Sequence, residues 1–419
     1  MSSSPRSMLF RFCLYGFLKN QQYYDPFLLL AFLQKGLSFS MIGVLIGFRE
    51  VCVNLMEIPA GAIADVLGRR RSMIASFLAY IASFVVFGLC DAVWALFAAM
   101  FLFSIGTAFR TGTHKAMIFD WLKRQDRTDE RTAVYGHTRS WSKLGSAVSV
   151  VIAAVLVFWT ENYSAVFLLC VVPYSLAIVS FATYPEYLDG PRHAHQHLST
   201  VARTLMKAVG RGFRHRRLRR LLVESMGYEG LYKSGKDYIQ PVLKTACLAM
   251  PVMWAMDEQQ RVAILVGAVY FILNLAGSVE ARRADAFAKN AGGEAQAMKK
   301  LWVFELAIFL LMAVGILVGY LTVIVLSFIL LSVFQNLWRP ILIGRVAHHA
   351  DPEQAATVLS IESQAKSLFV AVAAPLLGWA VDLTAGYNRQ YSFLPIAALG
   401  ISVSLLMLMW YRRAGSEEE

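Results

Sequence analysis

The stretch "EIPAGAIADVLGRRRS", Glu57–Ser72, carries two carboxylates and three consecutive arginines within a chain that is otherwise strongly apolar. Of the 419 residues, 57% are hydrophobic and 16% are charged, and the mean hydropathy is +0.51. Average soluble domains have about 25% charged residues, so this composition indicates a membrane protein. Charge is costly in such a chain, and its position in the quoted stretch needs a structural or functional reason.

Apolar runs along the chain are long enough to cross a bilayer many times. A transmembrane helix needs about 17 or more apolar residues. Uncharged runs of that length are residues 72–90, 92–109, 144–160, 162–185, 262–279 and 391–411. The longer run 306–338 divides near Gly319, and further spans that contain charges bring the total to about twelve. The sequence therefore predicts an all-α membrane protein. The first apolar segment has no signal-peptide cleavage site, so we expect it to remain as a helix.

Positively charged loops predict the orientation of the chain. Lys and Arg concentrate in alternate loops, which marks these loops as cytoplasmic and places both termini on that side. Arg110 and Lys115 end the fourth span there. The same asymmetry accounts for the net charge of +12, so no nucleic-acid partner is predicted.

An internal repeat predicts two similar halves. The longest polar segment, residues 185–217, is expected to be a cytoplasmic central loop between an N-terminal bundle, 1–184, and a C-terminal bundle, 218–419. Weak internal matches at shifts of 215 to 224 residues favour a duplicated six-helix unit. Such a duplication is typical of two-bundle transporters, so we expect two pseudo-symmetric six-helix bundles.

The quoted stretch lies where the second span reaches the cytoplasm. Gly61 allows a neighbouring helix to approach, Gly68 allows a sharp turn, and the arginines hold the loop inside. The simplest interpretation is a helix end followed by positive-inside residues. The complete spacing, however, resembles the signature between the second and third helices of the major facilitator superfamily. The matching residues are Gly61, Ala64, Asp65, Gly68, Arg69 and Arg70, and the usual basic residue after the aspartate is replaced by Val66.

The resemblance implies a membrane transporter that works by alternating access between two bundles. It also implies that Asp65 and Arg69 form a charge contact that closes the cytoplasmic side, and they are the predicted gating pair. A shift of 220 residues places Asp285 and Lys289 over this pair as a degraded copy.

Ionisable side chains within the spans predict a polar cavity. A charge at the bilayer centre costs roughly 2.5–3.5 kcal/mol, so pairing or contact with water is expected. Glu50, Asn54 and Glu57 fall on one helix face, and the seventh span repeats their spacing. The predicted cavity residues are Lys19, Gln22, Asp25, Arg49, Asn54, Arg139, Lys143, Lys233, Lys236 and Gln240. The alternative is that charges only pair to hold helices together, and Glu362 and Lys366 have the i, i+4 order of such a pair.

The cavity residues also bear on substrate and coupling. Their cations favour an anionic or zwitterionic substrate, although nearby carboxylates would offset some of that charge. Glu50, Glu57 and Glu229 are the predicted proton carriers, because desolvation favours the protonated form of a carboxylate. The alternative is that these acids form permanent salt bridges with Arg49 or Lys233.

The preferred prediction is a proton-coupled secondary transporter of a small organic solute. Export is favoured over uptake because the signature is prominent in antiporters. The alternatives are an importer, acting as a symporter of an organic anion or zwitterion, and a transporter-like sensor or scaffold. No phosphate-binding loop and no metal-ligand spacing is present in the sequence, so we expect no enzymatic activity, cofactor or metal. We expect a monomer that spans the lipid bilayer of a bacterial inner membrane.

Overall fold

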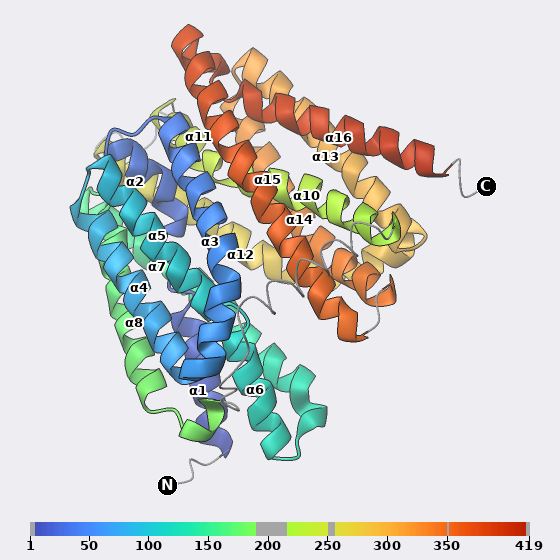
Figure 1. Cartoon of the computed structure of the whole chain (residues 1–419). Coiled ribbons are helices and arrows are strands. Elements are labelled where there is room, and N and C mark those ends of the chain that lie inside the picture. The colour runs from blue at the N-terminus through green and yellow to red at the C-terminus, as the bar shows by residue number, and fades with distance from the viewer. Residues whose placement is uncertain (1–4, 190–215, 250–255, 350–351, 416–419) are drawn as a thin grey trace. The chain divides into compact units, whose positions relative to one another are not determined.

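The described chain is helical throughout. The computed structural model describes residues 5–189, 216–249, 256–349 and 352–415, and within these ranges helices and short connections account for the backbone, with no strand (Figure 1). Ten helical segments of this described part are long and apolar enough to cross a membrane. The predicted all-α membrane architecture is therefore confirmed.

The ten candidate spans follow the apolar runs of the sequence. They lie in α3 (Phe39–Leu67), α4 (Arg69–Leu89), α5 (Val93–Arg110) with its continuation α6 (Thr113–Arg124), α7 (Arg131–Thr160), α8 (Ala165–Ala182), α12 (Glu258–Ala291), α13 (Glu294–Val318), α14 (Leu321–His349), α15 (Pro352–Tyr387) and α16 (Leu394–Gly415). α13 ends because Gly319 adopts a left-handed φ of +83°, which few side chains tolerate. The predicted division of the long apolar run near Gly319 is thus confirmed.

The first and seventh predicted spans are interrupted helices. The segments are α1 (Pro5–Leu18), η1 (Asp25–Phe27) and α2 (Leu28–Gln34) in the first half, and α10 (Arg216–Gly235), η4 (Lys236–Tyr238) and α11 (Ile239–Ala249) in the second. Lys19 directly follows α1, and Lys236 directly follows α10. Broken helices at corresponding positions of two halves are typical of transporter binding sites. A count of twelve membrane-crossing helices remains a prediction.

One compact unit contains residues 1–31, 48–204 and 259–271. Within it, α4 packs between α5 and α8, and α1 packs against α7 (Figure 1). Aromatic rings from α4 and α8 fill its core. The Tyr80 ring lies 5.9 Å from the Phe84 ring and 5.3 Å from the Tyr174 ring, measured between centroids. A short turn, η3 (Glu186–Asp189), packs onto α4 and α6.

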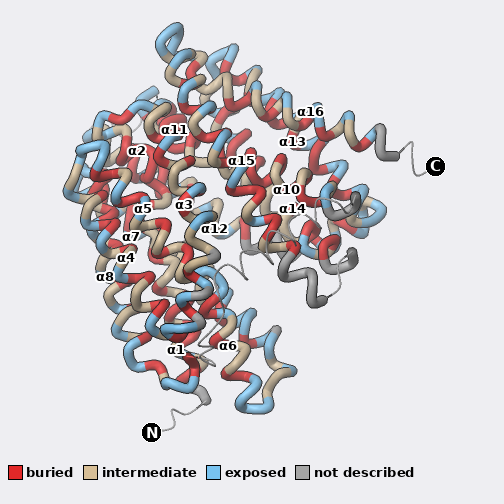
Figure 2. The backbone as a smooth tube through the Cα atoms, in the orientation of Figure 1, coloured by how far each residue is buried: buried red, intermediate tan, exposed pale blue. Residues whose placement is uncertain are grey.

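The other compact unit contains residues 32–47, 205–258 and 272–419. Within it, α10 packs against α14 and α15, and α13 packs against α14 and α16. In its core the Tyr228 ring stacks on Trp338 at 3.9 Å and meets the edge of Trp302 at 5.2 Å. Figure 2 shows buried positions recurring along α13 with exposed positions between them, whereas the described positions of α10 from residue 220 on are buried or half-buried. α13 therefore has one packed side, and its exposed leucines and valines suit contact with lipid.

Two helix segments belong to the compact unit of the opposite half of the chain. Residues 32–47, with the first turns of α3, lie in the unit of the second half, and residues 259–271 of α12 lie in the unit of the first. An added Cβ at Gly267 would lie 2.6 Å from the Cβ of Ala154 on α7. The division into bundles 1–184 and 218–419 remains a prediction. Most of the predicted central loop lies outside the described residues.

α3 and α15 approach closely enough for their backbones to touch. An added Cβ would lie 2.3 Å from a carbonyl oxygen of α15 at Gly43, and 2.1 Å from the carbonyl oxygen of Phe39 at Gly378. Only glycine fits such distances, as in other close helix pairs in membranes. Asp382 caps the start of α3 because its carboxylate accepts the backbone N–H groups of Phe39 and Ser40 at 3.1 and 2.7 Å.

The glycine contact predicts a large effect of one methyl group. We expect Gly378→Ala to destabilise the folded protein by about 1–3 kcal/mol, the usual cost of overpacking. Gly386→Ala is the matched control, because it lies on the same helix and an added Cβ there meets no heavy atom within 4 Å. Thermal unfolding in detergent compares the two variants. Equal midpoints for Gly378→Ala and the unaltered protein would contradict the close contact.

Candidate functional site

A cationic pocket lies within the compact unit of the first half. Its cavity volume is about 520 Å³, and it is lined by residues from the end of α1, the junction of α5 and α6, and α7. Its cationic lining residues are Lys19, Arg110, Lys115, Arg139 and Lys143. No Asp or Glu of the described residues belongs to this lining. The described lining therefore contains five cationic side chains and no acidic one.

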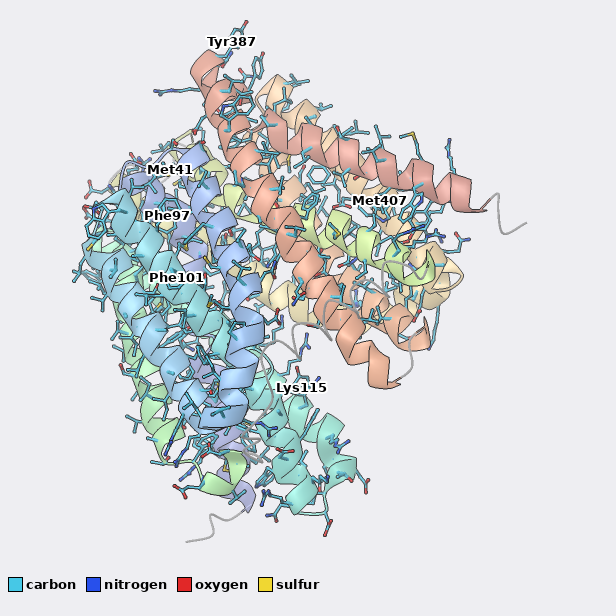
Figure 3. The ribbon with its side chains drawn as sticks, in the orientation of Figure 1. Met41, Phe97, Phe101, Lys115, Tyr387 and Met407 are labelled. Carbon is cyan, nitrogen blue, oxygen red and sulfur yellow. The ribbon has the colours of Figure 1, made fainter. Side chains whose placement is uncertain are left out.

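Local chain geometry brings these cations together. Lys19 follows the last residue of α1, where the helix is interrupted. Gly112 adopts a φ of +76°, and the turn that it makes between α5 and α6 leaves Arg110 and Lys115 on the same pocket. Figure 3 shows Lys115 near the beginning of α6. Arg139 and Lys143 are four residues apart on α7, so they share one helix face.

Aromatic rings support the cations of the pocket. The Lys19 ammonium lies 5.6 Å from the Tyr15 ring centroid, and Lys115 lies 5.6 Å from the Tyr135 ring. Contacts of this kind favour a cation without neutralising it. Within the described ranges, no carboxylate lies within 4.0 Å of Lys19, Lys115 or two further lining cations, Arg110 and Arg139. The remaining polar lining consists of Asn20, Gln22, Thr111, His114, Thr138, Ser142 and Ser146.

The structure brings together part of the predicted cavity. Of the predicted residues, Lys19, Gln22, Arg139 and Lys143 line the pocket. Asp25, Arg49 and Asn54 do not belong to its lining, and Arg49 donates to the carboxylate of Glu50 at 2.7 Å. Lys233, Lys236 and Gln240 lie in the other compact unit, where Lys236 pairs with Asp237 at 2.7 Å. A shared cavity of all ten residues remains a prediction.

Arg110 and Lys115 line the pocket although they were not among its predicted members. The sequence placed them at the end of a span. The feature that could have indicated their place in the pocket is the segment "RTGTHK", residues 110–115. A glycine between two cations permits a turn that presents both on one side. The predicted proton carrier Glu57 is half-buried on α3 and is not part of the pocket.

The signature turn ties α4 to its neighbours. Gly68 has a φ of +91°, and an added Cβ would lie 2.9 Å from the Asp189 carboxylate carbon, so glycine is required there. Arg69 forms an ion pair with Asp120 of α6. The backbone N–H of Arg70 donates to Asp189 at 2.9 Å, and its guanidinium donates to a backbone carbonyl of the segment before η3 at 3.1 Å.

The other members of the predicted gating motif are placed as follows. The side chain of Asp65 lies outside the described part of the structure, so its contact with Arg69 remains a prediction. An added Cβ at Gly61 meets no heavy atom of the described residues within 4 Å. Asp285 and Lys289 form an exposed pair on α12, with a distance of 2.7 Å between Nζ and Oδ2.

A second cluster, in the compact unit of the second half, is electrically neutral. Glu229 of α10 pairs with Arg339 of α14 at 2.9 Å and with Lys366 of α15 at 2.5 Å. Glu362 pairs with Arg339 at 2.9 Å and with Lys366 at 3.0 Å, and it accepts a hydrogen bond from Ser225. The pair of Glu362 and Lys366, predicted from their i, i+4 spacing, is thus confirmed on α15. Two acids and two bases therefore balance within this ion-pair cluster.

The comparisons with known proteins agree with this architecture. The sequence profile of the Major Facilitator Superfamily matches residues 12–361. The chain therefore belongs to this superfamily of membrane transporters, as the signature predicted. Membership of a transporter family, together with the transporter fold, also confirms that the chain is not an enzyme. No curated protein matches the chain.

Solved transporters share the fold over almost the whole chain. The nucleoside transporter NupG has a TM-score of 0.76 at 12% identity, over 96% of this chain and 99% of that one. The peptide transporter POT in complex with sulfate has a TM-score of 0.71 at 16% identity, over 97% and 95%. A POT family transporter in complex with 5-aminolevulinic acid has 0.72 at 15%, over 97% and 96%. At such identities the likeness shows the fold alone.

The neutral ion-pair cluster predicts a compensating pair of substitutions. Lys366→Met leaves two acids against one base, and breaking a buried ion pair costs about 3–5 kcal/mol. Glu362→Gln together with Lys366→Met restores neutrality, so we expect the double variant to recover part of that loss. Thermal unfolding in detergent measures both. A double variant less stable than Lys366→Met alone would contradict charge balance as the organising feature.

Proposed function

We propose that this secondary transporter moves a small organic anion or zwitterion and that its pocket is part of the substrate site. The observation that carries the proposal is a pocket lined by cations, of which Lys19, Arg110, Lys115 and Arg139 have no carboxylate within 4.0 Å in the described residues. An unpaired charge within a membrane costs roughly 2.5–3.5 kcal/mol. A ligand carboxylate or phosphate offsets that cost, and guanidinium groups bind such oxygens in fixed geometry.

The ligands named for the structural neighbours differ in charge. Sulfate and 5-aminolevulinic acid, named in complexes of the POT transporters, both carry a carboxylate or an equivalent negative group, whereas a nucleoside is neutral. A ligand with a negatively charged group suits the cationic pocket better than a neutral ligand does. The polar lining around the cations suits a ligand with further hydrogen-bonding groups, and its volume of about 520 Å³ accommodates a small metabolite.

Proton coupling and export complete the proposal. Glu57 is a candidate proton carrier from the sequence, together with Glu50 and Glu229. Glu50 pairs with Arg49 and Glu229 pairs with Arg339, which agrees better with the salt-bridge alternative. Export rests on the resemblance of the signature to that of antiporters. Uptake by symport is the alternative direction.

The gating motif belongs to the same proposal. The pairing of Arg69 with Asp120 holds the turn that follows α3, and Asp65 lies in the last turn of that helix. We assign Gly61, Asp65, Gly68, Arg69 and Arg70 to the closing of the transporter between its two bundles, with Asp285 as the second-half counterpart. The bundles, a bacterial inner-membrane location and a monomeric state are parts of this proposal.

A ligand screen tests the substrate class. We expect anionic and zwitterionic metabolites to raise the unfolding temperature of the detergent-solubilised protein, more strongly at low salt. A ligand at 100 times its dissociation constant stabilises by about 2.7 kcal/mol. Lys19→Ala and Arg139→Ala should each abolish the shift. Lys299→Ala, which removes an exposed lysine of α13, is the control and should retain it. A response to cationic compounds alone would refute the assignment, and a lasting absence of any response would favour the sensor or scaffold.

Transport assays test the gate. We expect Asp65→Asn to reduce counterflow of a ligand from that screen in proteoliposomes by at least about tenfold, because it removes the charge of the gating contact. Its thermal stability and membrane insertion should change little. Asp129→Asn, at an exposed aspartate of the short turn η2 (Thr128–Glu130), is the matched control and should leave counterflow unchanged. Unchanged counterflow in Asp65→Asn would remove Asp65 from the gate.

A further inference from the structure

One buried acid of the described chain differs from the others. The buried acids are Glu50, Asp189, Glu224, Glu229, Glu305 and Glu362. Five of them have a cation or a backbone N–H within hydrogen-bonding distance. Glu305 of α13 is only 2% exposed, and within the described ranges its Oε2 atom has no hydrogen-bond partner and its carboxylate forms no ion pair.

The pairing of α13 with α16 identifies what faces Glu305. The two helices are antiparallel, because the Gln390 side chain, just before α16, donates to the carbonyl of Leu317 at the end of α13. Further along, an added Cβ at Gly400 would lie 2.3 Å from the Phe309 ring. Figure 1 shows these helices side by side.

This register places a serine level with the acid. One turn back from Phe309 on α13 is Glu305, and one turn on from Gly400 on α16 is Ser404. Ser404 is fully buried, and its hydroxyl also has no hydrogen-bond partner within the described ranges. Two buried polar groups with unused hydrogen-bonding capacity thus lie at the same level of facing helices.

The charged and titratable groups around this position come from three packed helices. Tyr228 of α10 is the titratable group on which Glu305 acts electrostatically. On α14, Arg345 contacts the Met298 sulfur of α13, seven residues before Glu305, but it is already paired with Glu224 at 2.7 Å. On α16, the titratable group at that end of the core is Tyr411. No cation of these described helices offsets a charge on Glu305.

We propose that Glu305 is a proton-binding site and carries the coupling proton of the transporter. An ionised carboxylate without a partner is too costly in a membrane interior, whereas a carboxylic acid is neutral and keeps one O–H donor. The Ser404 hydroxyl, level with it on α16, is a polar group that the acid can reach by a change of side-chain rotamer. Proton uptake forms one O–H bond on a carboxylate oxygen, with the proton coming from water. Release returns it to water when the site opens. The carrier role rests on the proposed proton coupling, but proton binding itself does not.

Infrared spectroscopy of the purified full-length protein in lipid tests proton binding without any substrate. The spectrum of the unaltered protein minus that of Glu305→Gln should contain the carbonyl band of a protonated carboxylic acid at neutral pH. That band should disappear as the pH is raised and shift in heavy water. Glu294→Gln, on the same helix, is the matched control and should give no such difference band. Glutamine mimics the neutral acid, so the variant is expected to fold.

Each outcome decides the proposal. Absence of the band would show that Glu305 is ionised and would overturn the proposal. A band that neither titrates nor exchanges its proton would identify a permanent structural donor and would overturn the carrier role. Ser404→Ala provides a second variant that keeps the carboxyl, and it should move the band without removing it. Failure of every ligand to bind would count against the proposed function and would leave the infrared result standing.

Discussion

The cost of charge in a membrane interior organises this structure. An ion there is stable only when it is paired, hydrated or neutralised by a proton. The compact unit of the second half uses pairing, since Glu229, Arg339, Glu362 and Lys366 balance among themselves. The compact unit of the first half instead concentrates cations around a pocket whose described lining contains no acid. In the proposed function, a ligand with a negative group offsets their charge. The two units therefore solve the same physical problem in opposite ways.

The same environment explains why glycine has such specific positions. In lipid the hydrophobic effect does not drive helices together, so close backbone packing has to supply the attraction. Gly43 and Gly378 permit this between α3 and α15. Gly68 has a different task, because its positive φ and the nearby Asp189 exclude any side chain. A substitution at either kind of site acts through backbone geometry and leaves the local hydropathy almost unchanged.

The sequence allowed the spans, the break at Gly319 and four of the pocket residues to be predicted, because apolar runs and charges within them are local signals. The partners of Glu229 were missed, since Arg339 and Lys366 follow it by more than 100 residues and only tertiary packing brings them together. Arg110 and Lys115 were placed at a membrane exit because the turn at Gly112 was not foreseen. Glu305 was overlooked because it directly precedes the long uncharged run that drew attention to α13 and α14.

The uneven distribution of charge also determines how the membrane potential acts on the protein. Moving one elementary charge through the membrane field involves about 2.3 kcal/mol per 100 mV. The ion-pair cluster has no net charge, so its displacement is insensitive to voltage. The pocket carries up to five positive charges when empty and fewer when it holds an anion. Voltage therefore acts more strongly on the empty pocket than on the filled one, and the electrical work of a transport cycle depends on which form crosses the field.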